Sequence, residues 1–195
     1  MPEGRYGRGM GHGRQRLLRN LLGSLIVAAV IAGIGLGLPA VNRAIPAAHA
    51  IPAGRYAVAA GVSVVPPRGS AVDVTRTLPG EHEGSVLFLV GTLQYAIVVT
   101  PFTGTLREAA DRLRSKITSV AGYQIADGES ALTTDDGVAG RQGIYVTPGR
   151  DGRYAVFLDG GLAVELTVAG GIVDLRRRLR AVEASIRSLA FGGHP

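Results

Sequence analysis

The longest apolar run of the chain covers residues 21–41, which read LLGSLIVAAVIAGIGLGLPAV without a charged side chain. At 1.5 Å per residue, a helix of this length spans about 30 Å, the thickness of the hydrocarbon core of a bilayer. A helix that is apolar on every side needs lipid or a large protein around it, and this chain has only 195 residues. The pattern therefore predicts one transmembrane helix over residues 21–41.

Arginines on the N-terminal side of this run predict its orientation. They are Arg5, Arg8, Arg14, Arg16 and Arg19, whereas Arg43 stands alone on the other side. The positive-inside rule places the N-terminus in the cytoplasm and residues 44–195 on the extracytoplasmic side of the cell membrane. Cleavage after Ala50 remains an alternative, because Ala48-His49-Ala50 has the small-x-small form of a signal-peptide site. The apolar run is longer than the segment of about 7–15 residues found in signal peptides, which favours an uncleaved signal-anchor.

Alternating and short apolar runs from Tyr56 onward are typical of strands. We expect strands over residues 61–65, 71–75, 85–90 and 93–100, the last two joined by a tight Gly91-Thr92 turn. The period then changes to that of a helix. Thr105 and Glu108 form a capping-box pattern, and apolar residues follow at helical spacing up to Val120.

Strand patterns resume after this helix. We expect strands over residues 123–126, 131–134, 138–147, 154–158 and 162–168. Asp151-Gly152 and Asp159-Gly160-Gly161 are read as hairpin turns, because glycine readily adopts the positive φ that such turns need. Residues 162–168 alternate strictly, which predicts one buried and one open face. A final amphipathic helix is built on apolar positions from Leu175 to Leu189.

This order of elements predicts an α+β fold, an antiparallel sheet covered by two amphipathic helices and preceded by one transmembrane helix. The chain divides into a disordered basic cytoplasmic tail (1–20), the signal-anchor helix (21–41), a Pro/Ala linker (42–55) and an extracytoplasmic domain (56–191).

Charge is concentrated before the domain. Residues 1–43 hold six arginines and one glutamate, whereas the remainder holds 15 basic and 14 acidic residues. A domain so nearly neutral lacks the basic surplus of a nucleic-acid binder, so we expect no nucleic-acid partner. The last helix nevertheless carries a basic face, made by Arg176, Arg177, Arg178, Arg180 and Arg187. This face is either simply solvated or docks on anionic lipid headgroups or an acidic partner.

The candidate catalytic and metal-ligating residues do not form a recognisable set. The chain has no cysteine, and His82, within Glu81-His82-Glu83, is the only histidine of the domain, too few for a zinc site. Acidic residues at Asp127, Glu129, Asp135 and Asp136 lack calcium-loop spacing and are explained by turn chemistry. No G-x-S-x-G elbow is present. We therefore expect no catalytic residue, no metal, no cofactor and no enzymatic activity.

The domain resembles the PsbP/Mog1-like family over about residues 56–191. The resemblance lies in the strand pair 85–100 running into Pro101, the 105–120 helix, the Asp135-Asp136-Gly137 turn before a meander, and the closing helix that ends at Phe191. It extends to actinobacterial cell-envelope proteins of the LpqN lipoprotein type, from which this chain departs by having a membrane helix in place of a lipid-modified cysteine. The family has no shared catalytic residues and serves as scaffolding and assembly modules, so the resemblance carries no site over.

Together these observations predict a single-pass, membrane-anchored envelope protein whose periplasmic domain is a non-catalytic protein-binding or assembly module, with a membrane or envelope protein as partner. The alternative is a binding module for a lipid or another apolar envelope molecule, since a sheet covered by helices can leave a groove.

Overall fold

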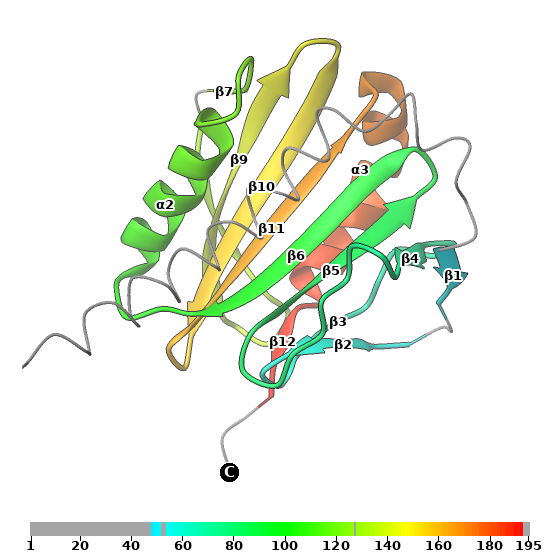
Figure 1. Cartoon of the computed structure of the whole chain (residues 1–195). Helices are drawn as coiled ribbons and strands as arrows, with labels where there is room; N and C mark the ends of the chain where they lie inside the picture. Colours follow the sequence, from blue (N-terminus) through cyan, green and yellow to red (C-terminus); the bar gives the residue numbers. More distant parts are fainter. Residues whose placement is uncertain (1–47, 52–53, 127, 193–195) are drawn as a thin grey trace, which may run out of the picture.

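The computed structural model describes residues 48–51, 54–126 and 128–192 (Figure 1). The strands are β1 (Ala48–Ala50), β2 (Tyr56–Ala59), β3 (Val62–Val64), β4 (Ala71–Asp73), β5 (Gly84–Val90), β6 (Leu93–Pro101), β7 (Gln124–Ile125), β8 (Ser130–Thr133), β9 (Ala139–Thr147), β10 (Arg150–Asp159), β11 (Leu162–Gly170) and β12 (Ala190–Phe191). The helices are α2 (Leu106–Thr118) and α3 (Ile172–Arg187).

Within the described ranges, nine strands form one sheet in the order β1-β4-β5-β6-β11-β10-β9-β7, with β8 also paired to β9. All of its pairs are antiparallel. Strand β11 therefore lies in the middle, between β6 and β10. A second, smaller sheet has the order β12-β3-β2.

The two helices lie on opposite faces of the large sheet (Figure 1). Helix α2 packs against β7, β9 and β10 on one face, whereas α3 packs against β10 and β11 on the other. Each face has its own hydrophobic cluster. The α2 cluster includes Leu113, Ile117, Tyr145, Tyr154 and Val156. The α3 cluster is larger and also takes in the small sheet, with Val62, Phe88, Tyr95, Phe157 and Val182 among its members.

The predicted start of α2 is confirmed. Thr105 is the N-cap, its side chain accepts a hydrogen bond from the Glu108 backbone N–H, and the Glu108 carboxylate accepts one from the Thr105 N–H. Reciprocal capping of this kind satisfies two backbone donors that have no partner within the helix. The β5–β6 hairpin turns at Gly91-Thr92 as expected.

The prediction of a hairpin turn at Asp151-Gly152 is wrong. Both residues lie in β10, and the chain instead turns three residues earlier, at Pro148-Gly149, where the φ of Gly149 is +75°. Gly152 serves packing: it pairs with Tyr145 across the sheet, and the Tyr145 ring lies directly over it. A local pattern of aspartate and glycine cannot distinguish these two uses of glycine.

The prediction of one open face for residues 162–168 is also wrong. In β11 the residues that point toward α2, Ala163, Glu165, Thr167 and Ala169, are as buried as those that point toward α3. Every residue of β11 from Ala163 to Gly170 is buried, although the contacts of α2 are mostly with strands to one side of β11.

Two differences concern the start of the domain. Residues Ala48–Ala50, within the predicted linker, form β1 and pair with β4. The predicted transmembrane helix, residues 21–41, lies outside the described residues. Among the residues that are described, no helix has both the length and the hydropathy to cross a membrane.

Gly152 allows a test of the packing around Tyr145. A Cβ at this position would lie 2.1 Å from Tyr145 Cζ, and that ring is buried and stacked on Tyr123 at 5.8 Å between centroids. We expect Gly152→Ala to lower the free energy of unfolding by about 1–3 kcal/mol through overpacking. Urea unfolding followed by circular dichroism measures this. In a Tyr145→Leu background the same change should cost less; an equal cost in both backgrounds would show that the ring is not the cause.

Candidate functional site

The most distinctive polar feature of the described domain is a buried ion cluster around Glu165. This carboxylate, at the centre of β11, is 2% exposed. Arg112 donates to Glu165 Oε1 from Nε at 3.1 Å and from Nη2 at 2.9 Å, and Lys116 Nζ lies 2.9 Å from Oε2. Two cations thus face one carboxylate, which leaves the cluster with an excess positive charge.

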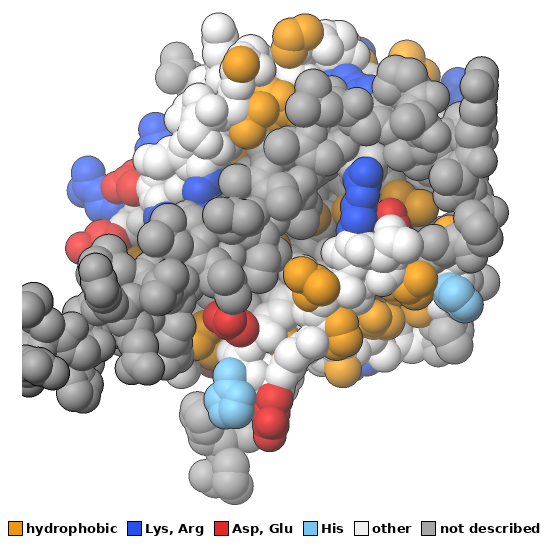
Figure 2. Space-filling view, in the orientation of Figure 1, with side chains coloured by type: hydrophobic (Ala, Val, Ile, Leu, Met, Phe, Trp, Pro, Cys, Tyr) orange, Lys and Arg blue, Asp and Glu red, His pale blue; other side chains and the backbone are white. Residues whose placement is uncertain are grey.

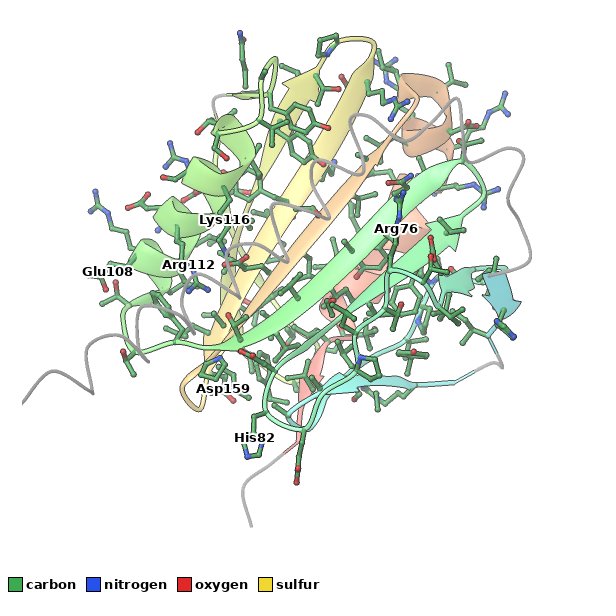
Figure 3. The ribbon with its side chains drawn as sticks, viewed as in Figure 1. Arg76, His82, Glu108, Arg112, Lys116 and Asp159 are labelled. Carbon is green, nitrogen blue, oxygen red and sulfur yellow. The ribbon has the colours of Figure 1, made fainter. Side chains whose placement is uncertain are left out.

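The sequence of α2 places both cations over β11. Arg112 and Lys116 are four residues apart, so they lie one above the other on the same side of the helix (Figure 3). Arg112 is held further by Thr100 Oγ1, 3.1 Å from Nη2, and by the Phe102 ring, whose centroid lies 4.6 Å from the guanidinium carbon. Burial lowers the pKa of Lys116 below its ordinary value, although the Glu165 carboxylate partly opposes this shift.

On the side of the sheet that faces α2, the helix covers only part of the surface. Its backbone packs mainly against β7, β9 and β10, at one side of the sheet, and the long side chains of Arg112 and Lys116 reach β6 and β11. Farther across, the side chains on the same face come from β5, β6 and β11, as the strand pairing shows. We call this area the β5–β6–β11 face and define it by Ser85, Leu87, Gln94, Ala96 and Thr167.

The β5–β6–β11 face is chemically unsatisfied among the described residues. Leu87 and Ala96 are buried, yet they belong to neither hydrophobic cluster of the domain. Ser85 Oγ and Gln94 Oε1 are buried without a hydrogen-bond partner in the described part of the chain. A buried polar atom left without a partner costs about 1–3 kcal/mol. All five side chains that define the face are 5% exposed or less, so a group that pairs with Ser85 Oγ and Gln94 Oε1 can reach them only when the face is uncovered.

The cavities near the site are small or open. One of about 160 Å³ lies where β5 begins and β6 ends, lined by Leu78, Pro79, Gly84, Val98 and Thr100 among others. A second, of about 510 Å³, is a polar depression between the outer side of α2 and β7. Figure 2 shows mixed positive and negative side chains over α2, and hydrophobic side chains around the loop before β5, where Val74 and Leu78 are exposed.

The candidate residues identified from the sequence are scattered. Glu81, His82 and Glu83 lie in an exposed turn before β5, and Figure 3 shows His82 at the end of the molecule away from Arg76. The described residues contain no group of three or more histidines and carboxylates placed to hold a metal ion.

The acidic stretch is divided in the same way. Asp127 lies outside the described residues, whereas Asp135 and Asp136 occupy an exposed turn. Glu129 is instead engaged in the fold: it pairs with Arg141 and accepts a hydrogen bond from the Tyr154 hydroxyl at 3.1 Å. The acidic residues are therefore not gathered around one cleft.

Sequence reasoning missed Glu165. The only signal was a single acidic residue in a strand whose neighbours are small or apolar, LAVELTVAG. That signal was read as part of a solvated face, because the partners of Glu165 lie 49 and 53 residues away in the chain.

The chain is matched by no family model and by no curated protein in sequence. Among solved structures it is similar to CyanoP, the cyanobacterial PsbP of Synechocystis sp. PCC 6803, with a TM-score of 0.51 and 13% identity over 71% of this chain and 91% of that one. It also matches PA94 of Pseudomonas aeruginosa, a protein of unknown function and putative regulator, with a TM-score of 0.47 and 15% identity over 60% of this chain and 87% of that one. A third match is the Ran-binding protein Mog1p of Saccharomyces cerevisiae, with a TM-score of 0.46 and 9% identity over 67% of this chain and 89% of that one. The likeness to CyanoP shows that the described domain has the α+β fold called PsbP/Mog1-like.

Proposed function

We propose that this chain is a single-pass, membrane-anchored envelope protein whose domain is a non-catalytic protein-binding module, and that the partner binds the β5–β6–β11 face. The anchor in this proposal is the uncharged run of residues 21–41, with the domain outside the cytoplasm. The finer resemblance to LpqN-type envelope proteins belongs to the same proposal, as does the role in assembly that it implies.

The observation that carries the proposal is the pair of buried polar atoms without a hydrogen-bond partner, Ser85 Oγ and Gln94 Oε1. Leu87 and Ala96 beside them are 1% and 2% exposed, so the partner binds only once the face is uncovered. An interface core of this kind, apolar with a few hydrogen-bonding groups, is typical of protein–protein contacts. A partner segment supplies backbone and side-chain groups for the two polar atoms and apolar side chains for Leu87 and Ala96.

The same observation favours a protein over the alternative ligand, a lipid. An acyl chain would cover Leu87 and Ala96 but would leave Ser85 Oγ and Gln94 Oε1 unpaired, at a cost of about 1–3 kcal/mol each.

A site-specific crosslink tests the proposal. A photoreactive residue at Leu89, which is half-buried and pairs with Gln94 at the edge of the face, should give an adduct with one discrete envelope protein in native membranes. The same residue at Ser115, exposed on the outer side of α2, is the matched control and should give none. Adding Leu87→Arg should abolish the Leu89 adduct, because a charge buried without a partner is strongly unfavourable. Since Leu87 is 1% exposed, circular dichroism of the purified variant is the check that the fold is kept.

Three results would contradict the proposal. Equal adducts from Leu89 and Ser115 would show non-specific proximity. A mass increase that corresponds to a lipid would favour the alternative function. An adduct within the chain, to residues 1–47, would show that the protein's own N-terminal segment occupies the face.

A further inference from the structure

The outer surface of the first half of α3 combines exposed apolar and unpaired cationic side chains. Val173 is 62% exposed and Ile172 is 40% exposed, which makes Val173 the most exposed large hydrophobic residue of the described domain. Arg176, Arg177 and Arg180 are exposed on the next two turns. We define these five residues as the α3 patch.

The arginines of the α3 patch have no partner among the described residues. No salt bridge or hydrogen bond in that part of the chain involves Arg176, Arg177 or Arg180. On α2, Arg112, Arg114 and Lys116 are engaged with carboxylates, whereas the exposed Arg107 has no such partner among the described residues. The nearby acidic groups are already occupied: Asp174 accepts a hydrogen bond from the Thr92 hydroxyl, and Glu183 pairs with Arg153.

The α3 patch lies toward the end of the sheet at which β1, the first described strand, is found. The Thr92–Asp174 contact, 2.6 Å between oxygens, places the first turn of α3 beside the β5–β6 turn. Strand β1 lies toward the same end, because Ala50 pairs with Ala71, and Ala71 pairs with Leu89, two residues before that turn. The C-terminal end of β1 and the α3 patch therefore share one end of the sheet, and Ala48, which pairs with Asp73, lies two residues or about 7 Å farther from it.

Chain length then limits how far this end can lie from a bilayer. If residue 41 ends the membrane span, seven residues reach Ala48, at most about 25 Å when fully extended. From β1 to β11 is four strand spacings, about 20 Å. A bilayer surface within reach of the anchor is thus also within reach of the α3 patch.

We propose that the α3 patch is a membrane-contact surface, with Ile172 and Val173 inserted at the headgroup level and Arg176, Arg177 and Arg180 bound to anionic lipid phosphates. Short apolar side chains next to arginines are the composition of helices that lie on a membrane surface. Contact would hold the domain in one orientation on the bilayer, with the patch toward the lipid. This inference rests on the anchoring in the proposed function and adds the surface and the lipid class that the domain recognises.

The experiment uses the full chain reconstituted in vesicles. Since the chain has no cysteine, Val173→Cys can be labelled alone with an environment-sensitive fluorophore. Leu78→Cys is the matched control, because Leu78 is 52% exposed but lies beside Ser85, near the opposite end of β5. Vesicles of phosphatidylcholine with brominated acyl chains, with and without 30% phosphatidylglycerol, provide the two surfaces.

We expect the Val173 label to be quenched and blue-shifted in the vesicles that contain phosphatidylglycerol, and the Leu78 label to be unaffected. Replacing Arg176, Arg177 and Arg180 together with glutamine should remove the quenching, since each arginine contributes about a fivefold preference for the anionic surface. High salt should weaken it as well, because the headgroup attraction is screened.

Equal exposure of the Val173 label in both vesicle types, or equal quenching at Leu78, would overturn the inference. Alkaline extraction of the same vesicles separates this from a failure of the anchor. A chain that stays in the vesicles with an unquenched Val173 label overturns the contact surface alone, whereas a chain released by alkali overturns the anchoring and this inference with it.

Discussion

Glu165→Gln is expected to lower the free energy of unfolding of the chain by about 3 kcal/mol, the lower end of the range for breaking a buried ion pair. The substitution keeps the side chain's shape but leaves Arg112 and Lys116 without a counter-charge. Lys116 has only 11% of its side chain exposed, so little water can solvate its ammonium group when the carboxylate is removed. The side chain of Arg112 is 33% exposed and can turn toward solvent, so we expect a cost at the lower end of the range for a broken buried ion pair.

Two measurements separate this cost from a simple loss of packing. Urea unfolding gives the free energy, with Asp111→Asn as the control, because Asp111 forms an exposed pair with Arg114 and should cost less than about 1 kcal/mol. Because the chain has a single lysine, NMR of isotope-labelled lysine follows the Lys116 ammonium alone. Its pKa, already lowered by burial, should fall further in Glu165→Gln, since the carboxylate that opposes the shift is removed.

The apolar replacement of the whole cluster provides the opposite test. Converting Glu165 to leucine together with Arg112 and Lys116 to methionine should recover most of the lost stability, because a packed apolar group avoids the desolvation of charges. If the triple variant is less stable than Glu165→Gln, the cluster is a net source of stability, contrary to this account.

Local patterns predicted the elements of this fold well and their environments poorly. The capping box at Thr105 and the turn at Gly91-Thr92 depend only on residues that are close in the sequence. Both were therefore predictable, and both are confirmed. Gly152 has the same local signature as a turn glycine but is used to make room for a ring on another strand. Glu165 looked solvated because its two partners are supplied by a helix that lies about 50 residues earlier.

The β5–β6–β11 face was beyond sequence reasoning for the same reason. Ser85 and Gln94 are ordinary strand positions in the sequence, and only the sheet register brings them to one face with Leu87, Ala96 and Thr167. The short strands β1 and β12 carry too few residues to show a pattern of their own. The basic face of the last helix, by contrast, was visible as a run of arginines, and the structure adds the exposed Ile172 and Val173 beside it.

The domain should unfold steeply in alkali. Burial raises the pKa values of Tyr95 and Tyr145 far above the ordinary range, and burial with the nearby Glu129 carboxylate raises the pKa of Tyr154 to about 12. In the unfolded chain each tyrosine ionises near pH 10. Above that pH the unfolded state releases protons that the folded state keeps, so the free energy of unfolding falls. These three tyrosines therefore contribute their full share of the free energy of unfolding below pH 10. That share is lost as the pH rises toward the folded-state pKa of each tyrosine.

The loss amounts to about 1.4 kcal/mol per pH unit for each tyrosine, and so about 4 kcal/mol per pH unit for the three together. At this slope, a domain that is stable by about 5–10 kcal/mol is expected to unfold between roughly pH 11 and pH 13. Lys116 has the opposite sign, because its lowered pKa makes stability rise with pH, but only up to its unfolded value near 10.4, below this window.

Absorbance at 295 nm against pH measures this directly, because the chain has six tyrosines and no tryptophan. Part of the phenolate signal should appear near pH 10, and the signal of Tyr95, Tyr145 and Tyr154 should appear later, in one steep step together with the loss of circular dichroism. Tyr95→Phe is the matched control: it removes a hydroxyl whose contact with Ser185 is long, 3.5 Å, and should reduce the slope of stability with pH by about one third while the fold is kept. Six tyrosines that titrate together near pH 10, with the circular dichroism unchanged, would show that these rings are accessible to hydroxide and that the two hydrophobic clusters are not packed as described.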